Sequence, residues 1–137
     1  MRAAFSLMAL LSLALPAAAD EMWDTQFGRM QWETDIGDTA VFVLDAPDQP
    51  RLRAFIQGLA LDVAGERGAY SGFWTIEGGE QDCPMQMTDP MGTKTNAWGQ
   101  LQITFVGTGF PSDWAGLSGS CFETPDQPIS GVAVTGQ

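Results

Sequence analysis

The side chains that could carry out chemistry in this 137-residue chain are carboxylates, because the chain contains no histidine. The lack of histidine excludes Ser-His-Asp and Cys-His mechanisms, and it excludes metal sites built on imidazole. The single lysine, Lys94, lies in the polar stretch GTKTN, which offers none of the desolvation that a catalytic lysine requires. We therefore expect a protein that is not an enzyme, unless paired carboxylates supply an activity.

The densest group of carboxylates is the stretch EGGEQD, which contains Glu77, Glu80 and Asp82. Two suitably spaced carboxylates can hydrolyse a glycoside, but a small β-domain leaves little room for a cleft that holds several sugars. The same side chains could supply oxygens to a calcium ion, although their spacing does not match an EF-hand loop. Glycoside chemistry and calcium binding are weak alternatives, and we expect no cofactor.

Five tryptophans offer a second source of function, since aromatic side chains often contact sugars or partner proteins. Trp32 and Trp74 are expected in the core. Trp98 shares a strand face with glutamines, and Trp114 is expected in a turn, so we expect both to be exposed. The candidate partner-binding residues are Trp98, Trp114, Glu77, Glu80 and Asp82.

Trp23 and Trp32 each begin one copy of a repeated six-residue motif, WDTQFG and then WETDIG. The copies are nine residues apart, so on an unbroken strand their tryptophans would point to opposite faces unless Gly28 bends the chain. We interpret the repeated motif as two strands that each end in a glycine turn, with Trp23 as a cover at the N-terminus. Trp32 should then be far more buried than Trp114.

Residues 1–19 have the layout of a secretory signal peptide, with Arg2, an apolar run over residues 3–15 and an A-x-A sequence that ends at Ala19. The apolar run is about 13 residues, shorter than the roughly 20 that span a bilayer, although an uncleaved anchor is the alternative. We expect cleavage after Ala19, a single β-domain over residues 20–137 with short terminal extensions, and a bacterial periplasmic or secreted location. No later stretch is long and apolar enough to predict a membrane-embedded protein.

The chain beyond residue 19 carries seventeen acidic and five basic side chains, a side-chain charge of −12. Such a field disfavours nucleic acid and anionic lipid as partners and favours a cationic one, although a solvated acidic surface is the simpler interpretation. The two cysteines, Cys83 and Cys121, are expected to form one disulfide in an oxidising compartment. That bond would close a loop of about 39 residues and stabilise the fold by about 4 kcal/mol. Nothing in these features indicates an oligomeric state.

In the elements that must position these residues, hydrophobic side chains recur at every second position. The clearest strand covers residues 96–106, where Leu101, Ile103 and Phe105 alternate with polar side chains. Residues 51–61 could form a strand or a helix, and the alternating arginines favour the strand. Turn residues recur every eight to twelve positions and separate seven to eight short strands. This spacing predicts an all-β fold, either a small antiparallel β-barrel or a β-sandwich, with one disulfide.

Residues 72–74 read G-F-W, which resembles the G-x-W of lipocalin- and avidin-like barrels. In its layout of export signal, about a hundred residues, one disulfide and no catalytic group, the chain also resembles small exported bacterial β-barrels that inhibit lysozymes or secreted proteases. The second resemblance implies an exported, non-enzymatic domain that binds a cationic protein or saccharide. The alternative is a barrel that binds a small apolar or saccharide ligand. It requires a continuous internal cavity, and a core filled by tryptophan and methionine would count against it.

Overall fold

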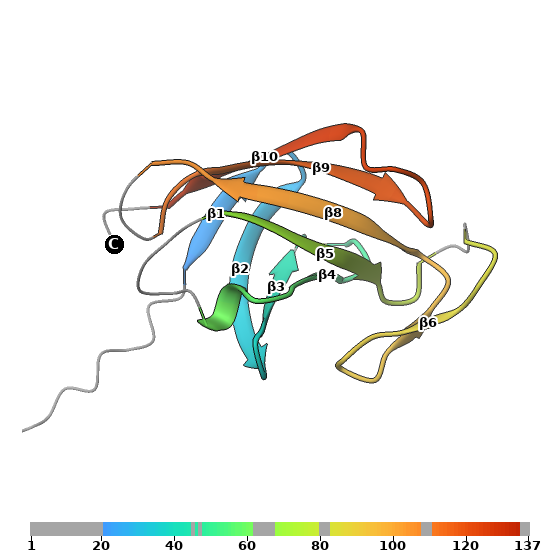
Figure 1. Ribbon diagram of the computed structural model, residues 1–137. Helices are drawn as coiled ribbons and strands as arrows, with labels where there is room; N and C mark the ends of the chain where they lie inside the picture. Colours follow the sequence, from blue (N-terminus) through green and yellow to red (C-terminus); the bar gives the residue numbers. More distant parts are fainter. Residues whose placement is uncertain are drawn as a thin grey trace, which may run out of the picture.

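The computed structural model describes residues 21–44, 46, 48–61, 68–79, 83–107 and 111–134. Within these residues, eight antiparallel strands form a closed barrel (Figure 1). They follow one another around the barrel in chain order, and β1 closes it by pairing with both β2 and β10. The strands are β1 (Met22–Thr25), β2 (Gly28–Ile36), β3 (Thr39–Leu44), β4 (Leu52–Ile56), β5 (Ala69–Ile76), β8 (Trp98–Phe105), β9 (Trp114–Ser120) and β10 (Gln127–Ala133). The predicted antiparallel barrel is confirmed, and full closure rules out the sandwich.

A short hairpin of β6 (Met87–Thr88) and β7 (Lys94–Thr95) stands outside the barrel, on the connection between β5 and β8 (Figure 1). Asp89 fixes this hairpin. One of its carboxylate oxygens accepts the backbone N–H of Met91 at 2.8 Å and that of Thr93 at 3.0 Å. The other oxygen accepts the hydroxyl of Thr75 on β5 at 3.0 Å. The buried carboxylate therefore joins the hairpin turn to the barrel wall.

Alternation along the strands decides which side chains form the core. On β8, Leu101, Ile103 and Phe105 are buried inside the barrel, and the polar residues between them are exposed. The ambiguous segment 51–61 forms β4, as the alternating arginines indicated, followed by a single 3-10 turn, η1 (Leu59–Leu61). None of the described residues forms an α-helix, and no described helix is long and apolar enough to cross a membrane.

The repeated tryptophan motif forms a hairpin, in which a two-residue turn joins β1 to β2. Because the chain reverses there, Trp23 pairs with Met30 and faces the barrel interior. The prediction that Trp23 is a surface cover is therefore wrong, since its side chain is fully buried and its Nε1 donates to the carbonyl of Ser112 at 2.9 Å. Trp32 is only half-buried, because a bulge follows it on β2 and its Nε1 donates to the exposed Asp35 at 2.6 Å.

Candidate functional site

One end of the barrel is hollow and encloses a cavity of about 490 Å³. Every strand of the barrel contributes to its wall, and the turns that follow β1, β3 and β5 border its mouth. Most of the wall is apolar, with Met30, Leu44, Leu52 and Leu101 among the contributing side chains. The cavity is therefore a cup within the barrel and not a groove on its surface.

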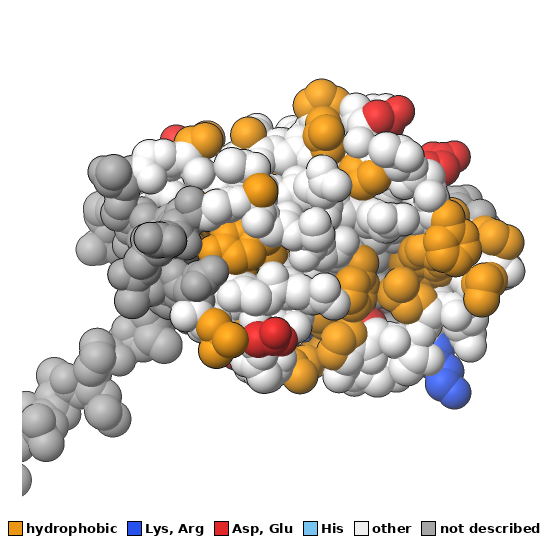
Figure 2. Space-filling view, viewed as in Figure 1, with side chains coloured by type: hydrophobic (Ala, Val, Ile, Leu, Met, Phe, Trp, Pro, Cys, Tyr) orange, Lys and Arg blue, Asp and Glu red, His pale blue; other side chains and the backbone are white. Residues whose placement is uncertain are grey.

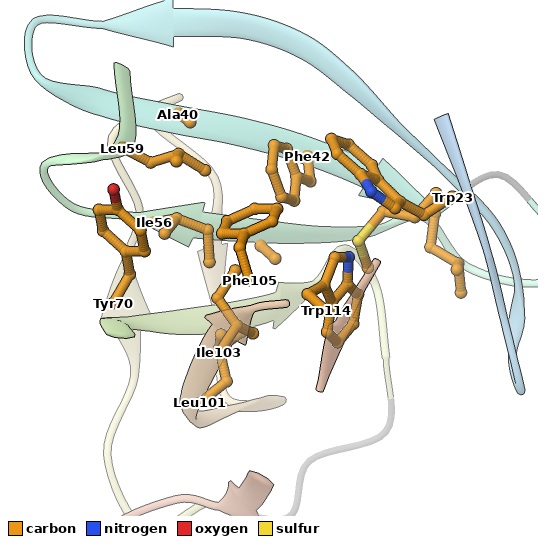
Figure 3. Packing of buried hydrophobic residues seen from close by; sticks show 13 residues of the cluster. Trp23, Ala40, Phe42, Ile56, Leu59, Tyr70, Leu101, Ile103, Phe105 and Trp114 are labelled. Atoms are coloured by element: carbon orange, nitrogen blue, oxygen red, sulfur yellow. The ribbon is translucent and has the colours of Figure 1, made fainter. Parts of the chain in front are cut away.

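The opposite end of the barrel is filled by aromatic side chains that form the floor of the cup. The ring of Trp23 lies 5.1 Å from that of Phe42 and 6.2 Å from that of Phe105. Tyr70 meets Phe105 edge-on at 6.0 Å. Figure 3 shows Phe42, Phe105 and Ile56 meeting inside the barrel. This packing makes the barrel solid at one end and leaves the other end hollow.

Two tryptophans that line the cavity each lie against a glycine of the wall. Trp74 is the direct cross-strand partner of Gly99, and Trp114 is the partner of Gly131. A β-carbon on Gly99 would lie 2.6 Å from Cε2 and Cζ2 of Trp74, and one on Gly131 would lie 2.5 Å from Nε1 of Trp114. Real carbon contacts are about 3.5–4.0 Å, so each indole occupies the space that a side chain would need. Large side chains therefore cover the wall and do not fill the lumen.

Trp114 is the first residue of β9 and does not lie in a turn. It faces inward, because it pairs with Phe105 of β8 and Gly131 of β10, and it is 3% exposed. The expectation that Trp114 is exposed is wrong, and so is the expectation that Trp32 is far more buried than Trp114. The predicted turn ends before Trp114, and strand pairing then carries the indole inside. Trp32 and Trp74, predicted as core, are half-buried and pack against the core cluster.

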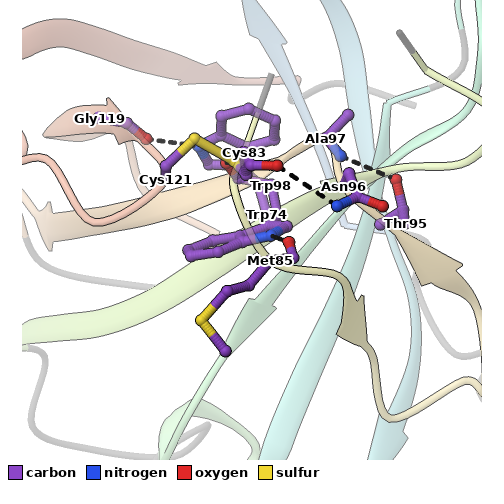
Figure 4. The surroundings of a disulfide bond; sticks show 9 residues. All are labelled: Trp74, Cys83, Met85, Thr95, Asn96, Ala97, Trp98, Gly119 and Cys121. Atoms are coloured by element: carbon purple, nitrogen blue, oxygen red, sulfur yellow. Dashed lines mark hydrogen bonds between the residues drawn. A yellow bond between two sulfur atoms is a disulfide. The ribbon is translucent and has the colours of Figure 1, made fainter. Parts of the chain in front are cut away.

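Trp98 lies on the predicted face of its strand, together with the glutamines, but its side chain is not exposed as predicted. It pairs with Thr75 on the outer face of the barrel and is only 4% exposed. The segment before β6 lies over it, and the Nε1 of Trp98 donates to the carbonyl of Met85 at 2.8 Å (Figure 4). The ring of Phe122 packs edge-on against that of Trp98, with 4.8 Å between the ring centroids. The cause of the burial is tertiary, because the disulfide fixes both covering segments.

The predicted disulfide between Cys83 and Cys121 is confirmed, with 5.3 Å between the two Cα atoms (Figure 4). It joins the connection before β8 to the turn after β9, both at the mouth of the cup. The backbone N–H of Cys83 donates to the carbonyl of Asn96, and that of Cys121 donates to the carbonyl of Trp98. The bond therefore fixes the rim of the cavity and also stabilises the fold.

Two of the hydroxyls in the cavity wall lie on β9, where inward positions are occupied by Ser118, which is half-buried, and by Ser120, which is exposed at the mouth. Neither hydroxyl has a hydrogen-bond partner among the residues that the structure describes. Trp114, on the same inner face, has a buried Nε1 that likewise lacks a partner within the described residues. Thr25, across the wall, already donates to the carbonyl of Gly28 at 2.7 Å. β9 thus carries the unpaired hydroxyls of a mostly apolar cup, and the Gln49 amide, on the turn after β3, is a further polar group in the lining.

Charged side chains lie outside the cup, and none of the described residues that line it is ionisable. Glu77 is exposed on the outer surface, where its carboxylate lies 3.7 Å from the guanidinium of Arg53. Glu80 and Asp82 fall outside the described residues. No group of three potential metal ligands occurs among the residues described. The structure therefore does not bring together the predicted set of Glu77, Trp98 and Trp114 as one exposed surface.

Arg53 is a nearly buried cation on the outer face of β4. Its Nε donates to Glu33 at 3.1 Å, and this hydrogen bond is the main reason that its pKa is raised above the ordinary value, against the opposing effect of burial. At the exposed end of β1, Asp24 raises the pKa of Arg29 through a hydrogen bond of 2.9 Å and through its charge. Both pairs are part of the outer surface, and neither lies among the described residues that line the cavity.

Sequence reasoning missed the residues that create the cavity. Gly99 and Gly131 each interrupt a stretch with strand character, and a glycine inside a strand often marks a close approach of another group. Ser118 and Ser120 are two positions apart, so their common face could have been inferred once β9 was recognised.

A comparison of the chain with protein-family models, curated proteins and solved structures finds no match, so the cup is interpreted from its own geometry.

Proposed function

We propose that this protein binds a small, predominantly apolar molecule in the cup at the hollow end of the barrel. The observation that carries the proposal is a cavity of about 490 Å³ whose described lining has no ionisable side chain. Sites for small molecules are typically concave, mostly apolar and about 300–1,000 Å³ in volume. This favours the small-ligand barrel, which the sequence left as the alternative, over the macromolecular inhibitor.

Binding without chemistry fits the same site, because its described lining offers no general base that could activate a serine hydroxyl as a nucleophile. The proposal includes export to an oxidising compartment, where the Cys83–Cys121 bond is stable. In that setting, the protein would hold a poorly soluble molecule and release it unchanged.

The test uses the chain from residue 20 onward, purified with its disulfide intact, and the neutral fluorescent probe N-phenyl-1-naphthylamine. We expect saturable fluorescence enhancement at one site per chain. In Ile129→Trp an indole enters the lumen, and we expect at least a tenfold weaker affinity. Val132→Trp is the matched control on the outer face of the same strand, and it should bind as the native chain does. Equal binding by both variants would contradict the proposal.

A second candidate is a cationic protein that docks beside the disulfide. Phe122 and Met85 are 63% and 59% exposed, although both adjoin the buried Trp98. Figure 2 shows hydrophobic side chains gathered at the end of the molecule that carries the β6–β7 hairpin. The acidic charge of the chain would increase the association rate of a cationic partner at low salt. Capture of such a partner by the native chain, and not by Phe122→Ser, would support this candidate.

A further inference from the structure

We infer that the ligand of the cup is a neutral, mainly apolar molecule whose polar edge, a hydroxyl or carbonyl oxygen, lies against β9. This inference rests on the proposed function and specifies the chemistry of the ligand. It has three supports: the lack of charged side chains among the described lining residues, the unpaired hydroxyls on β9, and the flat aromatic surfaces nearby.

The described part of the wall has no charged side chain, and this disfavours an ionised ligand buried in the cup. A carboxylate moved from water into an apolar site without a cation loses its hydration and gains no compensating ion pair. No described lining residue is an arginine or a lysine, and the side-chain charge of −12 on the chain beyond residue 19 would also repel an anion. A cation would meet a favourable long-range field, but no described carboxylate inside the cup could pair with it. A neutral ligand avoids both costs.

The polar groups on β9 give the ligand an orientation. Ser118 and Ser120 are two positions apart on one strand face, so their β-carbons are separated by roughly 7 Å. A hydroxyl can donate and accept, and neither of these two has a partner within the described residues. Trp114, deeper on the same face, adds a buried indole N–H without a described acceptor. Buried donors are almost always satisfied, and a ligand oxygen near this strand would supply the missing acceptor.

The aromatic side chains in the wall favour a ligand whose apolar part is flat. Trp74 lies against Gly99 at the level of Ser120, because Gly99 is the cross-strand partner of both residues. An indole that lies along the wall can present its face to the lumen, where ring stacking adds to simple burial. A fused aromatic probe therefore tests the body and the polar edge together.

The experiment measures displacement of N-phenyl-1-naphthylamine by four naphthalenes that differ in one group: 2-naphthol, 2-methylnaphthalene, 2-naphthoate and 2-naphthylmethylammonium. We expect 2-naphthol to bind most tightly at pH 7. The methyl compound should bind about 2- to 12-fold more weakly, because it lacks one neutral hydrogen bond. The carboxylate and the ammonium compound should each bind at least about tenfold more weakly than 2-naphthol.

The double variant Ser118→Ala with Ser120→Ala assigns this preference to β9. We expect it to bind 2-naphthol and 2-methylnaphthalene equally well in the same displacement assay. Ser130→Ala, an exposed serine on the outer face of β10, is the control and should keep the preference. Tight binding of either ion, or a preference for 2-naphthol that survives the double variant, would overturn the inference while the proposed function stands. Failure of every neutral probe to bind would overturn both.

Discussion

The contact between Trp114 and Gly131 is the most exacting test of how the cup is formed. In Gly131→Ala, the new β-carbon would lie 2.5 Å from Nε1 and 2.8 Å from Cζ2 of the indole, at least 0.7 Å closer than the 3.5 Å lower limit of ordinary carbon contacts. The obstacle is a side chain and not backbone, so the ring can move, and its way out is into the lumen. Overpacking of this kind costs about 1–3 kcal/mol. For the chain from residue 20 onward, about 118 residues, this lowers the Tm by about 4–12 °C.

The assay is thermal unfolding by circular dichroism, together with a titration of N-phenyl-1-naphthylamine. Gly131→Ala should lower both the Tm and the probe affinity, because the displaced indole takes up cavity volume. Gly68→Ala is the control, since a β-carbon there meets nothing within 4 Å, and its Tm should stay within about 2 °C. In a Trp114→Leu background, the cost of Gly131→Ala should fall below about 0.5 kcal/mol. A native Tm and native binding in Gly131→Ala would refute the wall packing of Trp114.

Three further outcomes follow from the same structure and are measured by thermal unfolding. Gly99→Ala should destabilise more than Gly131→Ala, because its β-carbon would meet the backbone carbonyl of Gly119 as well as Trp74, and backbone cannot rotate away. Replacing Cys83 and Cys121 together by serine should cost about 4 kcal/mol and lower the Tm by roughly 15 °C, and a loss below 1 kcal/mol would contradict the loop-entropy account. Arg53→Met should cost about 1 kcal/mol, because Glu33 is partly solvated, whereas Arg29→Met, in the exposed pair with Asp24, should leave the Tm unchanged.

The strands could be predicted because their evidence is local. Leu101, Ile103 and Phe105 alternate with polar residues, and that pattern alone placed β8 and its two faces correctly. The disulfide followed from there being only two cysteines. Trp23 shows the limit of such reasoning. The sequence indicated a glycine turn at Gly28, but it did not show that this turn closes a hairpin in which Trp23 pairs with Met30 and faces the barrel interior.

Exposure was harder to predict than strand face. Trp98 does lie on the outer face of β8, where a single barrel wall would leave it in water. It is buried because Met85 and Phe122 reach it from segments that are distant in sequence and joined at the Cys83–Cys121 bond. The alternation of residues along a strand predicts on which face a side chain lies. It does not predict which distant segments pack over that face.

The sequence by itself determined the all-β class, the positions of most strands, the disulfide and the excess of negative charge, because these depend on residue type, on alternation between neighbours and on counting. Only the tertiary structure decided that the barrel is hollow at one end. That outcome depends on which residues meet across strands: Trp74 on Gly99 and Trp114 on Gly131 line the wall, while Trp23, Phe42 and Phe105 fill the floor. The same tryptophans in another register would have filled the lumen, because register decides whether a large ring meets a glycine or another side chain.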